Sequence, residues 1–433
     1  MNEITVGITG LFVLLLLFLT GIDLGFGMAI VGFAGFACIR SFDAALIMIA
    51  TDLFETLSSY GLTVMPLFIL MGQLSFQAGV ANKLYDTAHK FVGHIPGGLA
   101  LATVLGTTMF KAVCGSSPAT TATFASIAVP EMERYGYSKR LSTGTVASSG
   151  TLGVLIPPSV SLIVFGLITE QSIGRLFLAG LVPGLMIAFF FALIILVWCR
   201  LNPTLGPKGH KYGWRERAVG LPEVIWPAVI FLLVIGGLMK GVFTPTEAGS
   251  VGTFAVLLLV VLKRNLNFKG YVTSIREALK TACMVFMMVV GSIIMGHFLA
   301  VTKIPMATAE WVGNLPVNRY LIIALIIVIY NIGGSFIDDF AFMMLATPVF
   351  FPAITKLGFD PCWFGIVIMA TVMIGGIIPP VAMNVFIVKN ITKVPFGVIY
   401  SGCYPFLIAL IASVVLLCAF PQIATFLPSL LMK

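Results

Sequence analysis

The side chains of this sequence that could bind a solute are concentrated in polar, glycine-rich breaks between apolar segments. One break covers residues 114–121 (CGSSPATT) and another covers residues 148–158 (SSGTLGVLIPP). Where a helix ends inside a membrane, its free N–H groups attract an anion and its free carbonyls attract a cation. These two breaks therefore predict a site for a hard cation such as Na+ beside a site for an anion. The alternative is a close-packed helix interface made of small residues.

Two further breaks, over residues 332–339 and 375–380, contain fewer hydroxyl groups, so more of their ligands would be backbone carbonyls. Their strongest signal is the pair Asp338 and Asp339, because a carboxylate near the bilayer centre is costly and usually functional. Either acid could instead only cap the helix that follows it.

Two basic side chains also lie in apolar surroundings. For Lys111, three roles are open: it binds the substrate, pairs with an acid, or extends toward water. For His297, we expect an interior group satisfied by a neighbour and not a ligand. The sequence shows no nucleophile–base pair, His/Glu metal motif or phosphate loop of known spacing, so we expect no enzyme activity.

The breaks belong to an internal repeat. Residues 153–158 (GVLIPP) return as residues 375–380 (GGIIPP) at an interval of 222, and residues 115–117 (GSS) return as 333–335 (GGS) at an interval of 218. Broken backbone in a membrane is tolerated only inside protein or beside a wet cavity, so the four breaks should meet. In transporters with inverted repeats, this meeting point is the substrate site.

Composition indicates a lipid environment. The 433 residues are 59% hydrophobic and 10% charged, against about 25% charged in soluble domains. Apolar runs long enough to span a bilayer cover residues 4–20, 24–39, 61–79, 176–199, 222–239, 247–262, 281–301 and 396–420. We therefore expect an all-α polytopic membrane protein.

The expected organisation has five regions. Residues 1–60 form N-terminal scaffold helices and an interfacial arm, 61–200 a first repeat, 201–280 basic loops with linking scaffold helices, 281–420 a second repeat, and 421–433 a C-terminal tail. Each repeat should hold a re-entrant helical hairpin, at about 96–130 and 319–352, and a broken helix, at about 141–168 and 361–391.

The charges predict the orientation. Most of the 25 Lys and Arg residues face the cytoplasm if the basic loops at 200–217 and 263–280 are cytoplasmic. This assignment inverts the two repeats and places the C-terminus in the periplasm. The basic residues lie in short loops and form no stripe, so we expect no nucleic-acid partner. Residues 44–58 either cross the membrane or, as we favour, lie on it, with Asp52 and Glu55 at the headgroups.

The segment 115–123 (GSSPATTAT), followed by residues 153–158 and mirrored by Asp338-Asp339 and residues 375–380, resembles the large membrane subunit of TRAP transporters, the tripartite ATP-independent periplasmic family. The resemblance covers nearly the whole chain. It implies a Na+-coupled elevator transporter of the bacterial inner membrane, with a scaffold and a transport domain as in the ion transporter superfamily. It also implies two partners, a small four-helix membrane subunit and a periplasmic substrate-binding protein.

Residue by residue, the resemblance implies two Na+ sites and a substrate site. The first Na+ site would use Cys114, Ser116, Gly153, Ile156 and Pro158, and the second Ile332, Gly334, Gly375, Ile378 and Pro380. The substrate would contact Ser116, Ser161 and Asp338, with Thr120 and Asn384 nearby. Cys114 departs from the hydroxyl residue expected there, which leaves its carbonyl as the ligand.

The resemblance implies a small organic anion as substrate without saying which one. Family members carry C4-dicarboxylates, sialic acid, keto acids, ectoines, or sulfonates such as isethionate and taurine, and selection lies largely in the binding protein. One alternative is a divalent-anion/Na+ symporter or an ion antiporter of the same architecture that works alone. A channel or a membrane-embedded enzyme is the alternative from another class.

Overall fold

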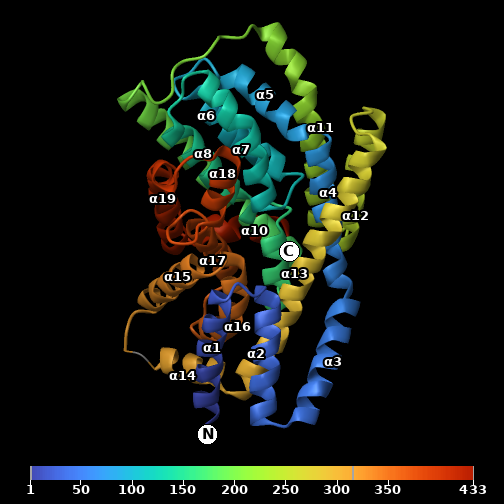
Figure 1. The fold of residues 1–433 in the computed structure, drawn as a ribbon, viewed down its shortest axis with the longest axis vertical. Coiled ribbons are helices and arrows are strands. Elements are labelled where there is room, and N and C mark those ends of the chain that lie inside the picture. Colours follow the sequence, from blue (N-terminus) through green and yellow to red (C-terminus); the bar gives the residue numbers. More distant parts are fainter. Residues whose placement is uncertain (1, 315, 433) are drawn as a thin grey trace.

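All secondary structure in the described part of the chain is helical (Figure 1). The computed structural model describes residues 2–314 and 316–432 and leaves the surroundings of residues 313 and 339 undescribed. Within this part, six helices are long and apolar enough to cross a membrane, and a bent pair described below makes a seventh if it is one span. The six are α10 (Ile173–Leu201), α11 (Trp214–Met239), α12 (Pro245–Leu262), α13 (Phe268–Val301), α15 (Arg319–Phe336) and α19 (Phe396–Ala419). The chain is therefore a multi-pass membrane protein.

Three N-terminal helices, α1 (Glu3–Leu19), α2 (Leu24–Ile39) and α3 (Phe42–Ser58), pack beside α13. The backbones of α2 and α13 touch because glycine leaves room between them: a Cβ on Gly25 would lie 2.6 Å from the carbonyl oxygen of Met287. This close contact joins the N-terminal helices to the second half of the chain.

The prediction that Asp52 of α3 faces the headgroups is wrong. Its side chain is 5% exposed, and its Oδ2 lies 2.8 Å from Nδ1 of His297 on α13. The partner is 245 positions away, which local sequence cannot indicate. His297 is satisfied by a neighbour, as expected, but it is half-exposed and not interior. Together α3 and the segment Tyr60–Gln77 form the bent pair, with an angle of 53°.

The helices of the two halves follow one plan. The first half contains η1 (Tyr60–Thr63), α4 (Val64–Gln77), α5 (Val80–Val92), α6 (Gly98–Lys111), α7 (Ser117–Arg134), α8 (Lys139–Gly150), η2 (Thr151–Val154), α9 (Val160–Ile168) and α10. The second contains α13, α14 (Ile304–Gly313), α15, α16 (Asp339–Lys356), α17 (Pro361–Gly375), α18 (Met383–Thr392), α19 and α20 (Gln422–Leu431). The second arms of the hairpins, α7 and α16, are separated along the chain by the same interval as the GVLIPP and GGIIPP motifs, at both their first and their last residues.

The hairpin tips differ in one respect from expectation. The sequence predicts a break over residues 332–339 within the second hairpin, but residues 332–336 lie within α15, which continues to Phe336. Ile337 N–H donates to the Gly333 carbonyl at 3.1 Å, so the helix continues through Gly333 and Gly334. The turn is instead made by Ile337 and Asp338.

The second part of each broken helix packs against the other half of the chain. The second part of the later broken helix, α18, packs on α7 and α8, and the second part of the earlier one, α9, packs on α16 and α17. In Figure 1 the hairpin α6–α7 lies in the upper part of the molecule and α15–α16 in the lower part. Each hairpin is thus covered by the broken helix of the other half.

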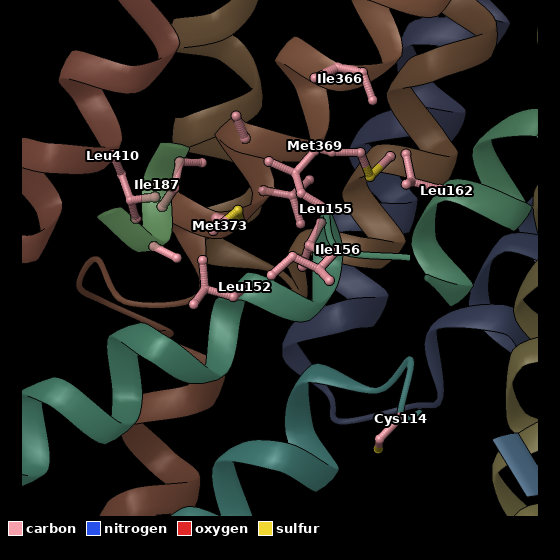
Figure 2. Packing of buried hydrophobic residues seen from close by; sticks show 14 of the residues in the cluster. Cys114, Leu152, Leu155, Ile156, Leu162, Ile187, Ile366, Met369, Met373 and Leu410 are labelled. Atoms are coloured by element: carbon pink, nitrogen blue, oxygen red, sulfur yellow. The ribbon is translucent and has the colours of Figure 1, made fainter. Parts of the chain in front are cut away.

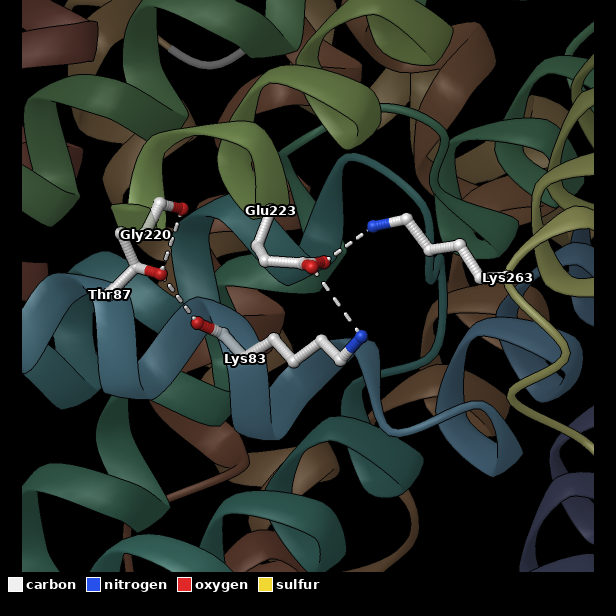
Figure 3. Close-up of polar contacts among 5 residues, drawn as sticks. All are labelled: Lys83, Thr87, Gly220, Glu223 and Lys263. Atoms are coloured by element: carbon white, nitrogen blue, oxygen red, sulfur yellow. Dashed lines mark hydrogen bonds and ion pairs between the residues drawn. The ribbon is translucent and has the colours of Figure 1, made fainter. Parts of the chain in front are cut away.

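A polar contact joins α5 to the linking helices (Figure 3). Glu223 of α11 lies between two lysines, with Lys263 Nζ 2.7 Å and Lys83 Nζ 3.5 Å from its carboxylate. Thr87 Oγ1 donates to the Gly220 carbonyl at 3.2 Å in the same contact. These bonds fix the amphipathic helix α5 against α11 and the end of α12.

Candidate functional site

A cavity of about 410 Å³ lies between the two hairpins and the two broken helices. Four of the five predicted substrate residues line it: Ser116, Ser161, Asp338 and Asn384. The fifth, Thr120, is fully buried behind the tip of the first hairpin, where its Oγ1 donates to the Ser116 carbonyl at 2.9 Å. The structure thus brings together residues from all four breaks.

Four helices begin at the cavity, and residues of their first turns line it. They are α7, α9, α16 and α18, with Ser117, Val160, Phe340 and Met383 at the wall. Helix N-termini carry partial positive charge and free N–H groups, so four together favour a bound anion. No basic side chain is among the described lining residues, so the helix ends supply the positive potential at this wall.

Side-chain caps position three of these helix ends. The Oγ of Ser116 accepts from Ala119 N–H at 3.3 Å, and the Oγ of Ser159 accepts from Leu162 N–H at 3.4 Å. Asp338 Oδ1 accepts from the N–H groups of Phe340 and Ala341 at 3.1 and 3.0 Å. Asp338 therefore caps α16, and its Oδ2 takes no part in that cap. The side chain of Asp339 lies outside the described part of the chain.

Asn384 connects the halves at the cavity. Its Nδ2 donates to Ser117 Oγ at 3.4 Å and to the Ala147 carbonyl at 3.2 Å. Ser117 Oγ in turn donates to the Gly150 carbonyl at 2.8 Å. One amide of the second half therefore holds the tip of the first hairpin against the break at the end of α8.

The apolar side chains of the break at residues 148–158 pack in the core. Figure 2 shows Leu155 and Ile156 pointing toward Met369 and Met373 of α17, while Cys114 lies apart on the hairpin loop. The loop and the break touch, because a Cβ on Gly115 would overlap the carbonyl oxygen of Pro158. The hairpin loop and the break thus meet at one point.

Lys111 ends at that point. Its side chain is fully buried, and its Nζ donates to the Ser116 carbonyl at 2.8 Å. It lies against Gly153, where a Cβ would overlap the Nζ. Lys111 does not extend toward water, so that prediction is wrong. No acid among the described side chains lies within salt-bridge distance of it. It does not line the cavity directly and lies behind Ser116.

The residues assigned to the second Na+ site lie around the other tip. Gly334 is in the last turn of α15, Ile332 lies two residues before it and is mostly exposed, and Gly375 ends α17. Val381 N–H donates to the Ser335 carbonyl at 3.0 Å and brings the second break to the second hairpin. Tyr400 Oη donates to the Pro380 carbonyl at 3.3 Å, which already satisfies one of the predicted ligands.

Sequence reasoning missed part of the cavity wall. Asp23, Gln73 and Met288 also line it. Asp23 had a local signal, since it is an acid between two apolar segments and caps α2 by accepting from Gly25 N–H at 3.0 Å. Gln73 and Met288 lie within α4 and α13, where no local pattern separates them from packing residues.

Comparison with known proteins identifies the family. Residues 11–423 match the family described as tripartite ATP-independent periplasmic transporter, DctM component. The chain belongs to this family. Its DctM-family relatives include the C4-dicarboxylate TRAP transporter large permease protein DctM of Pseudomonas aeruginosa, 33% identical over 88% of this chain and 89% of the relative.

Other relatives of this DctM-family chain are named for different substrates. The ectoine TRAP transporter large permease protein TeaC of Halomonas elongata is 35% identical over 85% of this chain and 86% of its own. The sialic acid TRAP transporter large permease protein SiaM of Vibrio cholerae is 29% identical over 96% of each chain. These relatives are permease subunits of transporters and not enzymes, so the chain is a TRAP transporter large permease subunit.

Solved structures share the fold at low sequence identity. The YdaH transporter of Alcanivorax borkumensis superposes with a TM-score of 0.63 at 15% identity, over 87% of this chain and 89% of that one. MtrF of Neisseria gonorrhoeae superposes with a TM-score of 0.59 at 14% identity, over 87% of this chain and 84% of that one. These likenesses concern the arrangement of helices alone.

Proposed function

We propose that this permease imports a small organic anion across the bacterial inner membrane, driven by Na+. The observation that carries the proposal is the cavity at which four helices begin, two of them hairpin arms and two of them parts of broken helices. Such a wall offers N–H groups to a carboxylate or sulfonate from several directions. Ser116, Ser161 and Asn384 would add hydrogen-bond donors, and Asp338 would accept a bond from a hydroxyl or amino group of the substrate.

The substrate class follows from this chemistry and from the relatives. A C4-dicarboxylate, a sialic acid, or a sulfonate such as isethionate or taurine would each present an anionic group to the helix ends. We propose that a periplasmic binding protein delivers the substrate and that a small four-helix membrane subunit completes the scaffold.

The proposed movement is of the elevator type. The two halves would be inverted repeats with their hairpins entering from opposite faces and the C-terminus in the periplasm. Support comes from the matched helix bounds and from the crossing of α9 and α18 onto the opposite hairpin. These contacts make the hairpins and broken helices one body, which would move against the remaining helices.

Bound Na+ would supply positive charge beside the substrate anion and so favour its binding. At the second break, the backbone carbonyls of Ile332, Gly334, Gly375 and Ile378 would hold it, with Pro380 at the edge of the site. Cys114, Ser116, Gly153, Ile156 and Pro158 offer carbonyls at the first break, where Lys111 also ends.

Uptake by proteoliposomes tests the proposal. The ligand that copurifies with the cognate binding protein should accumulate only when binding protein, small subunit and this chain are all present. Accumulation by this chain alone would instead support a stand-alone divalent-anion/Na+ symporter or an ion antiporter of the same architecture. Single-channel currents without the binding protein would support a channel.

A further inference from the structure

We infer that the ammonium of Lys111 takes the place of Na+ at the first break, so that the chain binds one Na+, at the second break. This inference rests on the proposed cation coupling and changes its stoichiometry. Lys111 would be a tethered cation that belongs to the transport body.

The ammonium of Lys111 contacts two residues that are predicted for the first Na+ site. Its Nζ donates to the Ser116 carbonyl at 2.8 Å and touches Gly153, and both residues belong to the predicted first Na+ site. The side chain is fully buried, and among the described residues no carboxylate lies within salt-bridge distance of it. A buried ammonium without an acid needs carbonyl oxygens, as a buried Na+ does.

The local fold directs the side chain to this place. Lys111 is the last residue of α6, and the loop from Ala112 to Ser116 turns back over it. Cys114 N–H donates to the Lys111 carbonyl at 3.3 Å and closes this turn. The lysine therefore returns to the tip of its own hairpin, and Gly153 provides the space for its Nζ.

Two cations cannot share this point. Like charges a few ångströms apart repel strongly where water is excluded, and here the Ser116 carbonyl is already bonded to the ammonium. The Ser116 carbonyl therefore serves an internal cation. The anion cavity still gains the positive charge, because Lys111 lies directly behind Ser116.

The second half has no such lysine. When the two repeat intervals are applied to Lys111, the matching positions are Ile329 and Gly333, and neither is charged. The second site therefore remains available to Na+. A tethered charge moves in both directions of the cycle, so it adds nothing to the net charge carried, and a monoanion with one Na+ would cross without net current.

Equilibrium binding of ²²Na+ to the purified two-subunit membrane complex tests the inference. The variants are Lys111→Ala, which removes the ammonium, and Lys356→Ala, an exposed lysine at the end of the second hairpin, as the control. Thermal unfolding in detergent shows whether each variant is folded. If Lys111→Ala does not fold, Lys111→Gln replaces it, because it keeps most of the volume without the charge.

We expect one Na+ per large subunit in the wild type and in Lys356→Ala, and two in the folded Lys111 variant. Two Na+ in the wild type would overturn the inference, and so would a folded Lys111 variant that binds no more Na+ than the wild type. Failure of the proposed function is distinguishable, because it would appear as wild-type uptake that needs no Na+. Na+-dependent uptake with two bound Na+ ions would refute only the inference that Lys111 replaces one Na+.

Discussion

Nδ2 of Asn384 on α18 lies 3.4 Å from Oγ of Ser117 on α7, and this hydrogen bond joins two residues that are 267 positions apart. The same nitrogen donates to the Ala147 carbonyl at 3.2 Å. The first hairpin is therefore held in place by the second half of the chain. Transport by one rigid body requires such links between the halves, because the cavity is shared by both.

Asn384→Ala should reduce uptake by at least about tenfold and lower the free energy of unfolding by about 1–3 kcal/mol, since it leaves the buried Ala147 carbonyl without this donor. Asn384→Asp should have a similar effect, because a carboxylate cannot donate. Uptake assays and thermal unfolding measure both. Thr392→Ala, on the same helix but with side-chain bonds, among the described residues, only to its near neighbours Val388 and Val394, is the control. Normal uptake by Asn384→Ala would contradict a role at the cavity.

Two variants of Asp338 distinguish its role as a helix cap from a role in substrate binding. Asp338→Asn keeps an oxygen that can cap α16, whereas Asp338→Ala removes it at a cost of about 1 kcal/mol. We expect both variants to lose transport and only the alanine variant to lose stability. Uptake and unfolding temperature are the measurements. Wild-type uptake by Asp338→Asn would show that the acid is a cap and nothing more.

Gly153→Ala tests the space that Lys111 fills. A Cβ at this position overlaps Lys111 Nζ, so the substitution should destabilise the protein by about 1–3 kcal/mol. Adding Lys111→Ala should recover part of that loss, because the overlap is removed. Gly236→Ala is the control, since its Cβ would meet nothing within 4 Å. Equal destabilisation in the single and double variants would show that the two residues do not compete for space.

The Asp52–His297 contact should fix α3 to α13. Asp52→Ala and His297→Ala should each lower the unfolding temperature, and the double variant should lower it by less than the sum. A coupling of about 0.5–3 kcal/mol is expected for residues in contact. Strictly additive effects would show that the 2.8 Å contact contributes nothing.

Local sequence indicated where helices begin near the breaks. Glycine, serine and proline mark these ends, and the internal repeat supports each assignment with a second copy. The helix α7 begins at Ser117, inside the predicted break at residues 114–121, and α16 begins at Asp339, the last residue of the predicted break at residues 332–339. The error at residues 333–335 has a physical cause: two glycines weaken a helix, but the backbone bond from Ile337 to Gly333 continues it.

Contacts between distant segments were not predictable from sequence. The partner of Asp52 lies 245 positions away, and the buried position of Lys111 depends on the gap left by Gly153 in another element. The cavity residues Gln73 and Met288 lie in apolar helices whose inward faces are set by packing. The predicted binding residues rest on the family resemblance, because these patterns alone do not assign them.

The most direct test of the account is uptake of the binding protein's ligand into proteoliposomes that contain both membrane subunits, with the binding protein outside. We predict accumulation when an inward Na+ gradient is imposed, and loss of accumulation when K+ replaces Na+ on both sides. Undiminished accumulation without Na+ would contradict the central claim that Na+ drives the import of an organic anion through this cavity.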